Sequence, residues 1–132
     1  MDMDARFVGE LRHTLLDLHK SLMDAQRIAY ERIHGRVATS GEFLGLVLEH
    51  PEFAWLRALS ALIARLDEWM EEKEGMSEEL AVIVAALRGL VATEGSNVLF
   101  STAYWKIVND VPEALIFHVK LWRLLESVRP TA

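Results

Sequence analysis

The sequence predicts an all-α protein, a helical bundle of four longer helices and two short ones. Apolar residues recur at steps of three and four along almost all of the 132 residues, and no window alternates as a strand would. Hydrophobic residues make up 52% of the chain, which excludes disorder and is enough for one core. Helix start and stop signals divide this pattern into segments. We therefore expect residues 1–132 to form a single helical-bundle domain.

The first longer helix is predicted over residues 4–34. One apolar stripe runs along it and ends just before Gly35, a residue suited to terminate a helix. The stripe consists of Phe7, Leu11, Leu15, Leu18, Leu22, Ala25, Ala29 and Ile33. At about 1.5 Å per residue this helix is roughly 46 Å long, which exceeds the length of every other predicted helix. Part of the stripe therefore needs cover from a short helix or from another subunit.

A short helix over 41–49 and a longer helix over 51–73 come next. The short helix begins at the capping box Thr39-Ser-Gly-Glu42, whose threonine and glutamate side chains satisfy free backbone N–H groups. The glycines of this corner are thereby explained without a phosphate-binding role. The short helix stops at His50-Pro51, and a proline suits the first turn of the helix that follows.

The second half of the chain is predicted to hold a longer helix over 78–93, a short helix over 97–109 and a longer helix over 112–128. The segment Lys73-Glu-Gly-Met-Ser77 is the clearest internal break, with Ser77 as a helix cap. Pro112 suits the first turn of the last helix.

Charge and composition exclude several classes of function. The net charge is −6 and no basic run occurs, so nucleic acids and acidic membrane surfaces are disfavoured as partners. The absence of cysteine excludes thiolate catalysis, disulfides and Cys-ligated zinc. The start MDMDARF lacks a signal-peptide apolar region, and the longest apolar stretch, 80–92, is too short to span a bilayer. We expect a cytoplasmic protein. No catalytic motif is present, so an enzyme is disfavoured.

Two Glu-x-x-His pairs, Glu10/His13 and Glu31/His34, have the spacing of di-iron ligands. Both pairs lie on the first helix, 21 residues or about 30 Å apart, so one metal cluster within a chain cannot use both. His13 also falls on the face opposite the apolar stripe, among charged residues spaced i,i+4 as ion pairs of a solvated helix are. We therefore assign no metal and no cofactor. The alternative is a metal shared by two antiparallel chains, with Glu10/His13 from one and Glu31/His34 from the other.

A second candidate site consists of Trp55, Arg57, His118 and Trp122. His118 lies on an apolar face of the last helix, where a buried imidazole needs hydrogen-bond partners. We predict a core histidine whose ring is satisfied by a side chain or a carbonyl. Arg57 is predicted to form a structural ion pair, and the tryptophans are predicted to pack in the core. The alternative is a ligand pocket between the helices over 51–73 and 112–128, lined by these four residues.

Three segments of the first half resemble small all-helical bacterial proteins of uncharacterised function. They are HGRV (34–37), FAWLR (53–57) and LSALIARLDE (59–68). The resemblance implies a cytoplasmic bacterial protein with a helical fold. It transfers no catalytic or binding residue.

The unmatched length of the first helix leads to the main functional hypothesis. We expect a non-enzymatic interaction or scaffold protein, a homodimer that buries the remaining stripe across a two-fold axis and that can bind a protein partner. The next hypothesis is a bundle that binds a small molecule in the Trp/Arg/His pocket. The third is the metal site that bridges two chains.

Overall fold

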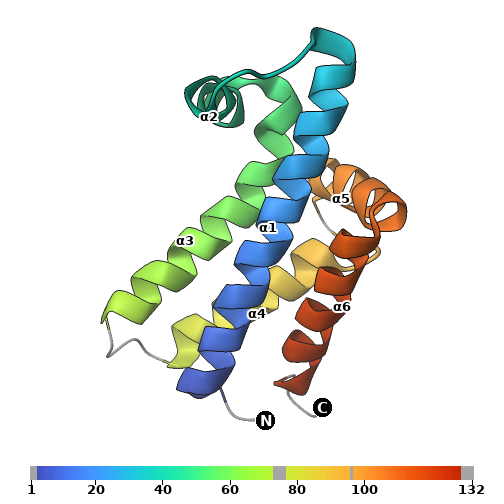
Figure 1. The fold of residues 1–132 in the computed structure, drawn as a ribbon. Helices are drawn as coiled ribbons and strands as arrows, with labels where there is room; N and C mark the ends of the chain where they lie inside the picture. Colours follow the sequence, from blue (N-terminus) through green and yellow to red (C-terminus); the bar gives the residue numbers. More distant parts are fainter. Residues whose placement is uncertain (1–2, 73–76, 96, 129–132) are drawn as a thin grey trace.

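The computed structural model describes residues 3–72, 77–95 and 97–128, and in these ranges helices are joined by short loops and no strand occurs. The described residues form six α-helices and one 3-10 helix, which confirms the all-α fold class (Figure 1). The helices are α1 (Ala5–His34), α2 (Ser40–Glu49), the 3-10 helix η1 (Pro51–Leu56), α3 (Arg57–Glu72), α4 (Ser77–Val91), α5 (Val98–Asp110) and α6 (Pro112–Ser127).

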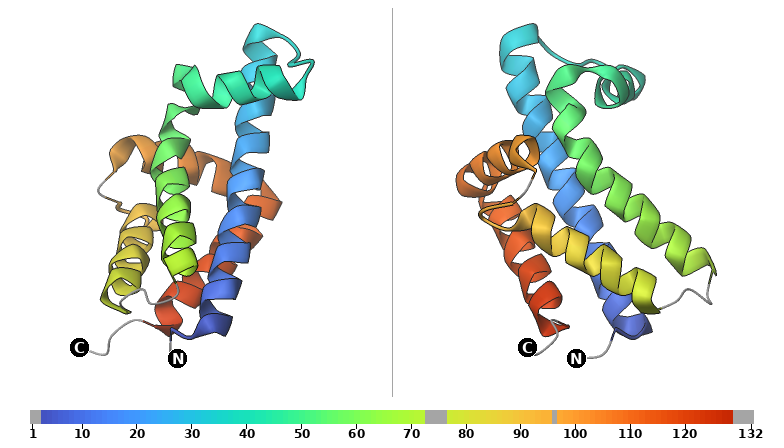
Figure 2. Two further views of the ribbon diagram at one scale, coloured as in Figure 1. Left: turned by 90° about the vertical axis from the view of Figure 1, so that its left-hand side faces the viewer. Right: turned by 180° about the vertical axis from the view of Figure 1, so that it is seen from behind.

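Helix α1 is the axis of the fold. It packs against α6, α3, η1 and α5, while α4 packs on α3, α5 and α6. Figure 2 shows α2 crossing the end of the bundle where α1 finishes. In its left view α5 (orange) passes behind α3 and α1. The described ends of the chain, at the start of α1 and the end of α6, lie together at the opposite end of the bundle.

The core follows the predicted stripe of α1 only as far as Leu22. Five stripe residues are fully buried, namely Phe7, Leu11, Leu15, Leu18 and Leu22. No described residue of α1 after Leu22 is buried, and Ile33 at the far end of the stripe is 74% exposed. The last third of α1 thus extends past the buried core: Tyr30 still packs against its edge, whereas Ile28 and Ile33 are exposed.

The local signals around the first corner act as predicted. Gly35 has a φ of 90°, a conformation that glycine adopts at little cost, and it ends α1. Thr39 caps α2 by accepting a hydrogen bond of 3.1 Å from the backbone N–H of Glu42. The Glu42 carboxylate accepts from the backbone N–H of Ala38 at 3.1 Å, one residue before the cap.

The helix predicted over 51–73 is divided in two. Residues 51–56 form the 3-10 helix η1, and the α-helix begins only at Arg57. Phe53 donates its N–H to the carbonyl of His50 at 3.0 Å, an i to i−3 bond that tightens this turn. The spacing of apolar residues does not distinguish a 3-10 helix from an α-helix over a segment of so few residues. Lys73, the break that it starts and the predicted cap at the Ser77 side chain lie outside the described residues.

Candidate functional site

The exposed end of α1 borders a groove of about 430 Å³ between α1 and α5. The apolar part of its lining comes from Ala25, Ala29, Ile33, Ala103, Ile107 and Val111. Ala25 and Ala29 are one helical turn apart on α1, so another helix could approach the backbone closely there. Ile33 and Ile28 on this part of α1 are 74% and 52% exposed. Helix α2 packs on η1 and contributes no residue to the lining of this groove, whereas the other short helix, α5, forms its second wall.

Charged residues of both signs line the same groove. Arg32 and Lys106 contribute cations, and Glu52 and Asp110 contribute carboxylates. A surface with two charges of each sign does not select a strongly acidic or strongly basic partner. It can, however, complement a copy of itself, because a two-fold axis brings each residue opposite a different part of the same patch.

The first predicted Glu-x-x-His pair lies on a solvated helix face, as the sequence indicated. Glu10 pairs with Arg6 at 3.4 Å, and His13 pairs with Asp17 at 3.3 Å. Both are i,i+4 contacts of exposed side chains, each of which contributes a few tenths of a kcal/mol at most. These contacts account for Glu10 and His13 within one chain.

The second pair, Glu31 and His34, is separated at the end of α1. Glu31 turns back into its own corner, where it accepts the backbone N–H of Val37 at 2.9 Å and pairs with Arg27 at 3.8 Å. His34 points toward the start of η1, where its Nε2 lies 2.7 Å from the Glu52 carboxylate. The two residues of this pair therefore do not converge on one point.

His118 is a core histidine with a side-chain partner, as predicted. It is 8% exposed, and its Nδ1 lies 2.6 Å from the hydroxyl of the fully buried Tyr104. Burial raises the pKa of Tyr104 and lowers the pKa of His118. Both groups are thus neutral near pH 7, and we assign the tyrosine hydroxyl as the donor to Nδ1, which places the proton of the imidazole on Nε2.

The four residues of the predicted pocket lie in three separate places. His118 and Trp122 line a cavity of about 240 Å³ together with Trp105. Trp55 is buried elsewhere, where it donates its indole N–H to the Gln26 side chain at 2.9 Å. Arg57 is exposed and donates to the backbone carbonyl of Leu48 at 2.8 Å, a helix-end carbonyl in place of the expected carboxylate.

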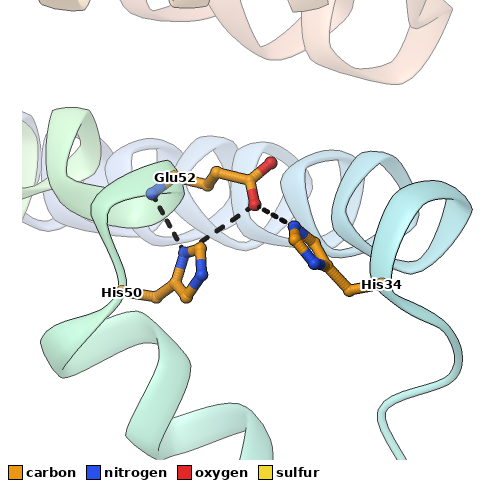
Figure 3. Close-up of side chains that lie close together, drawn as sticks. All are labelled: His34, His50 and Glu52. Atoms are coloured by element: carbon orange, nitrogen blue, oxygen red, sulfur yellow. Dashed lines mark hydrogen bonds and ion pairs between the residues drawn. The ribbon is translucent and has the colours of Figure 1, made fainter.

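His50 and Glu52 are residues that the sequence reasoning did not select. Pattern analysis used His50-Pro51 only as a helix stop, although His50 caps η1 with its ring. Both side chains lie beside His34 (Figure 3). The sequence contains one indication of this cluster: His50-Pro51-Glu52 lies at a predicted corner of the chain, and the predicted first helix ends in a histidine, His34.

The fold and these contacts define a helical-bundle protein with an open groove at one end. The chain matches no protein-family model, no curated protein and no solved structure. Among the described residues, every helix falls short of the length and apolarity that a membrane crossing requires.

Proposed function

We propose that the chain is a non-enzymatic, cytoplasmic interaction protein that acts as a homodimer. The surface that pairs is the groove between α1 and α5 together with the exposed end of α1. The observation that carries the proposal is the 74% exposure of Ile33, at the end of an apolar stripe whose first five residues are fully buried. An apolar side chain of this size, on a continuous stripe, gains most from burial against a matching surface.

A second copy is the occupant that the groove favours. The small residues Ala25 and Ala29 leave room for the exposed end of a neighbouring α1, and Ile33 is the side chain that would fill the facing groove. The mixed charges fit a self-complementary rim. A stable interface buries about 800 Å² on each partner, about a tenth of the 8214 Å² accessible surface of this chain.

Light scattering of the purified chain at micromolar concentration tests the proposal. We expect a mass of twice 15.0 kDa for the wild type. Ile33→Asp should weaken the dimer at least about tenfold, because it places a charge at the centre of the interface. The matched control is Ile116→Asp on α6, which is 56% exposed but does not line the groove. A monomeric wild type, or a dimer that Ile33→Asp does not weaken, contradicts the proposal.

The cavity beside His118 supports a second candidate function, the binding of a small molecule. Its lining includes the two indoles and the imidazole as well as residues 91–93, and the three rings suit a flat apolar ligand. Its volume of about 240 Å³ is below the roughly 300–1,000 Å³ of most ligand pockets, so only a small ring would fit. Isothermal titration calorimetry with indole tests this candidate. No heat of binding up to millimolar indole, or a heat of binding that Trp122→Leu leaves unchanged, contradicts it.

A further inference from the structure

Three potential metal ligands converge at the corner where α1, α2 and η1 meet. They are His34, the last residue of α1, His50, between α2 and η1, and Glu52, in the first turn of η1. One ligand atom from each lies within 4.8 Å of the other two (Figure 3). We propose that this corner is a binding site for a divalent transition metal ion, with Zn²⁺ as the natural probe.

Local structure delivers each ligand to the corner. His34 is the last residue of α1, because Gly35 with its φ of 90° ends the helix there. His50 lies between α2 and η1, and Pro51 begins η1 directly after it. Glu52 follows in the first turn of η1, so its carboxylate projects back toward the end of α1. Two helix ends thus face each other across one carboxylate.

An aromatic floor holds the two imidazole rings. Tyr30 stacks on His34 with ring centroids 4.4 Å apart, and it forms a T-shaped contact with His50 with centroids 5.1 Å apart. Phe53, which is fully buried, packs against Tyr30 and anchors this floor to the core. The rings are therefore positioned by packing, and a metal would not have to order free side chains.

The distances are close to those of a coordinated ion. The Glu52 Oε2 lies 2.7 Å from His34 Nε2 and 3.8 Å from His50 Nδ1. Around a tetrahedral ion with bonds of about 2.0–2.2 Å, neighbouring ligand atoms are roughly 3.3–3.5 Å apart. Shifts of under about 1 Å at these two contacts would produce that spacing. His50 Nδ1 would give up the hydrogen bond that it accepts from the Glu52 N–H, a long contact of 3.2 Å.

The ligand types select the class of metal. Two imidazole nitrogens and one carboxylate oxygen suit Zn²⁺ and its neighbours in the transition series, whereas Mg²⁺ and Ca²⁺ prefer all-oxygen sites. Three protein ligands leave a coordination position for water or for a small anion. The side chains are 40%, 30% and 31% exposed for His34, His50 and Glu52, so an ion can reach them from solvent.

An ordinary ion pair explains only part of this arrangement. A pair of His34 with Glu52 needs no second imidazole, yet His50 brings one to within 3.8 Å of the same carboxylate oxygen. His13 with Asp17 is the comparison within this chain, an exposed histidine paired with a carboxylate at 3.3 Å. No further ligand set is found around that pair among the described residues. We therefore expect zinc to bind at His34, His50 and Glu52 and not at His13 and Asp17.

The test is a zinc titration of the full chain after chelator treatment, with the dissociation constant read by competition with a chromogenic chelator. We expect one Zn²⁺ per chain. His34→Ala, His50→Asn and Glu52→Gln should each weaken zinc binding at least about tenfold, since even an outer-shell partner contributes about 10–100-fold. The Asn variant keeps a helix-capping side chain at position 50, so it removes the imidazole without removing the cap. Circular dichroism verifies that each variant keeps its helices.

His13→Ala is the matched control and should bind zinc as the wild type does. A wild type that takes up no stoichiometric zinc overturns the proposal. So does a ratio of one zinc per two chains with equal losses in His13→Ala and His34→Ala, because that result assigns the ion to the bridged site formed by Glu10, His13, Glu31 and His34. All three ligands belong to one chain, so one zinc per chain does not require the dimer. Glu52 also lines the groove between α1 and α5, so light scattering of Glu52→Gln distinguishes a loss of zinc from a loss of the dimer.

Discussion

Replacing Tyr104 by phenylalanine should destabilise the protein measurably, because it removes one buried hydrogen bond and little else. The hydroxyl lies 2.6 Å from Nδ1 of His118, and that imidazole is only 8% exposed. The variant leaves Nδ1 as a buried acceptor without its donor, which costs about 1–3 kcal/mol. For 132 residues the whole free energy of unfolding is roughly 7–20 kcal/mol, so the loss is a substantial fraction.

Urea unfolding followed by circular dichroism measures this loss. With a slope near 2 kcal/mol per molar urea, the midpoint should fall by roughly 0.5–1.5 M. The control is Tyr30→Phe, which keeps the aromatic ring at a half-buried position. We expect that control to change the free energy of unfolding by under about 0.5 kcal/mol. Equal losses in the two variants would refute the view that the Tyr104 hydroxyl satisfies His118.

Three further predictions concern pH, a helix cap and a close backbone approach. Burial lowers the pKa of His118 and of His19, so below about pH 6.5 the unfolded chain binds more protons than the folded chain. The free energy of unfolding measured in urea should therefore fall as the pH drops. The fall is at most about 1.4 kcal/mol per pH unit for a whole proton, and it is smaller for the half-exposed His19. A flat profile from pH 7.5 to 5.5 would contradict this. Thr39→Ala should cost about 1 kcal/mol in the same assay by removing the cap of α2, whereas Thr39→Ser should cost far less. Gly95→Ala should be destabilising, because its Cβ would lie 2.6 Å from Ser101 Oγ and 2.9 Å from a backbone carbonyl oxygen; an unchanged melting temperature would show that this loop yields freely.

The helix signals were readable because each depends on a few adjacent residues. Gly35 ends α1 and Thr39 starts α2 for reasons that are local to the corner. The buried stripe up to Leu22 was likewise readable from its period. The tight turn of η1 was not, because Pro51 is compatible with both an α-helix and a 3-10 helix and the segment is too short for period analysis.

The candidate sites depend on the order of helices around the bundle, which periodicity does not contain. Helical spacing placed Trp55 and His118 each on an apolar face, and both proved to be buried. It could not tell which faces meet: α3 packs on α1 and α4, while α6 packs on α1, α5 and α4. Periodicity did not reveal the cluster of His34, His50 and Glu52 either, because it does not show that the end of α1 lies beside the start of η1.

Native mass spectrometry of the full chain tests the central claim, that the exposed end of α1 is an interface between two copies. The spectrum reads the number of chains and any bound metal at once. We predict a two-chain ion of twice 15.0 kDa for the wild type and a one-chain ion for Ile33→Asp. A wild type that remains a single chain up to tens of micromolar would contradict the claim, whatever metal it carries.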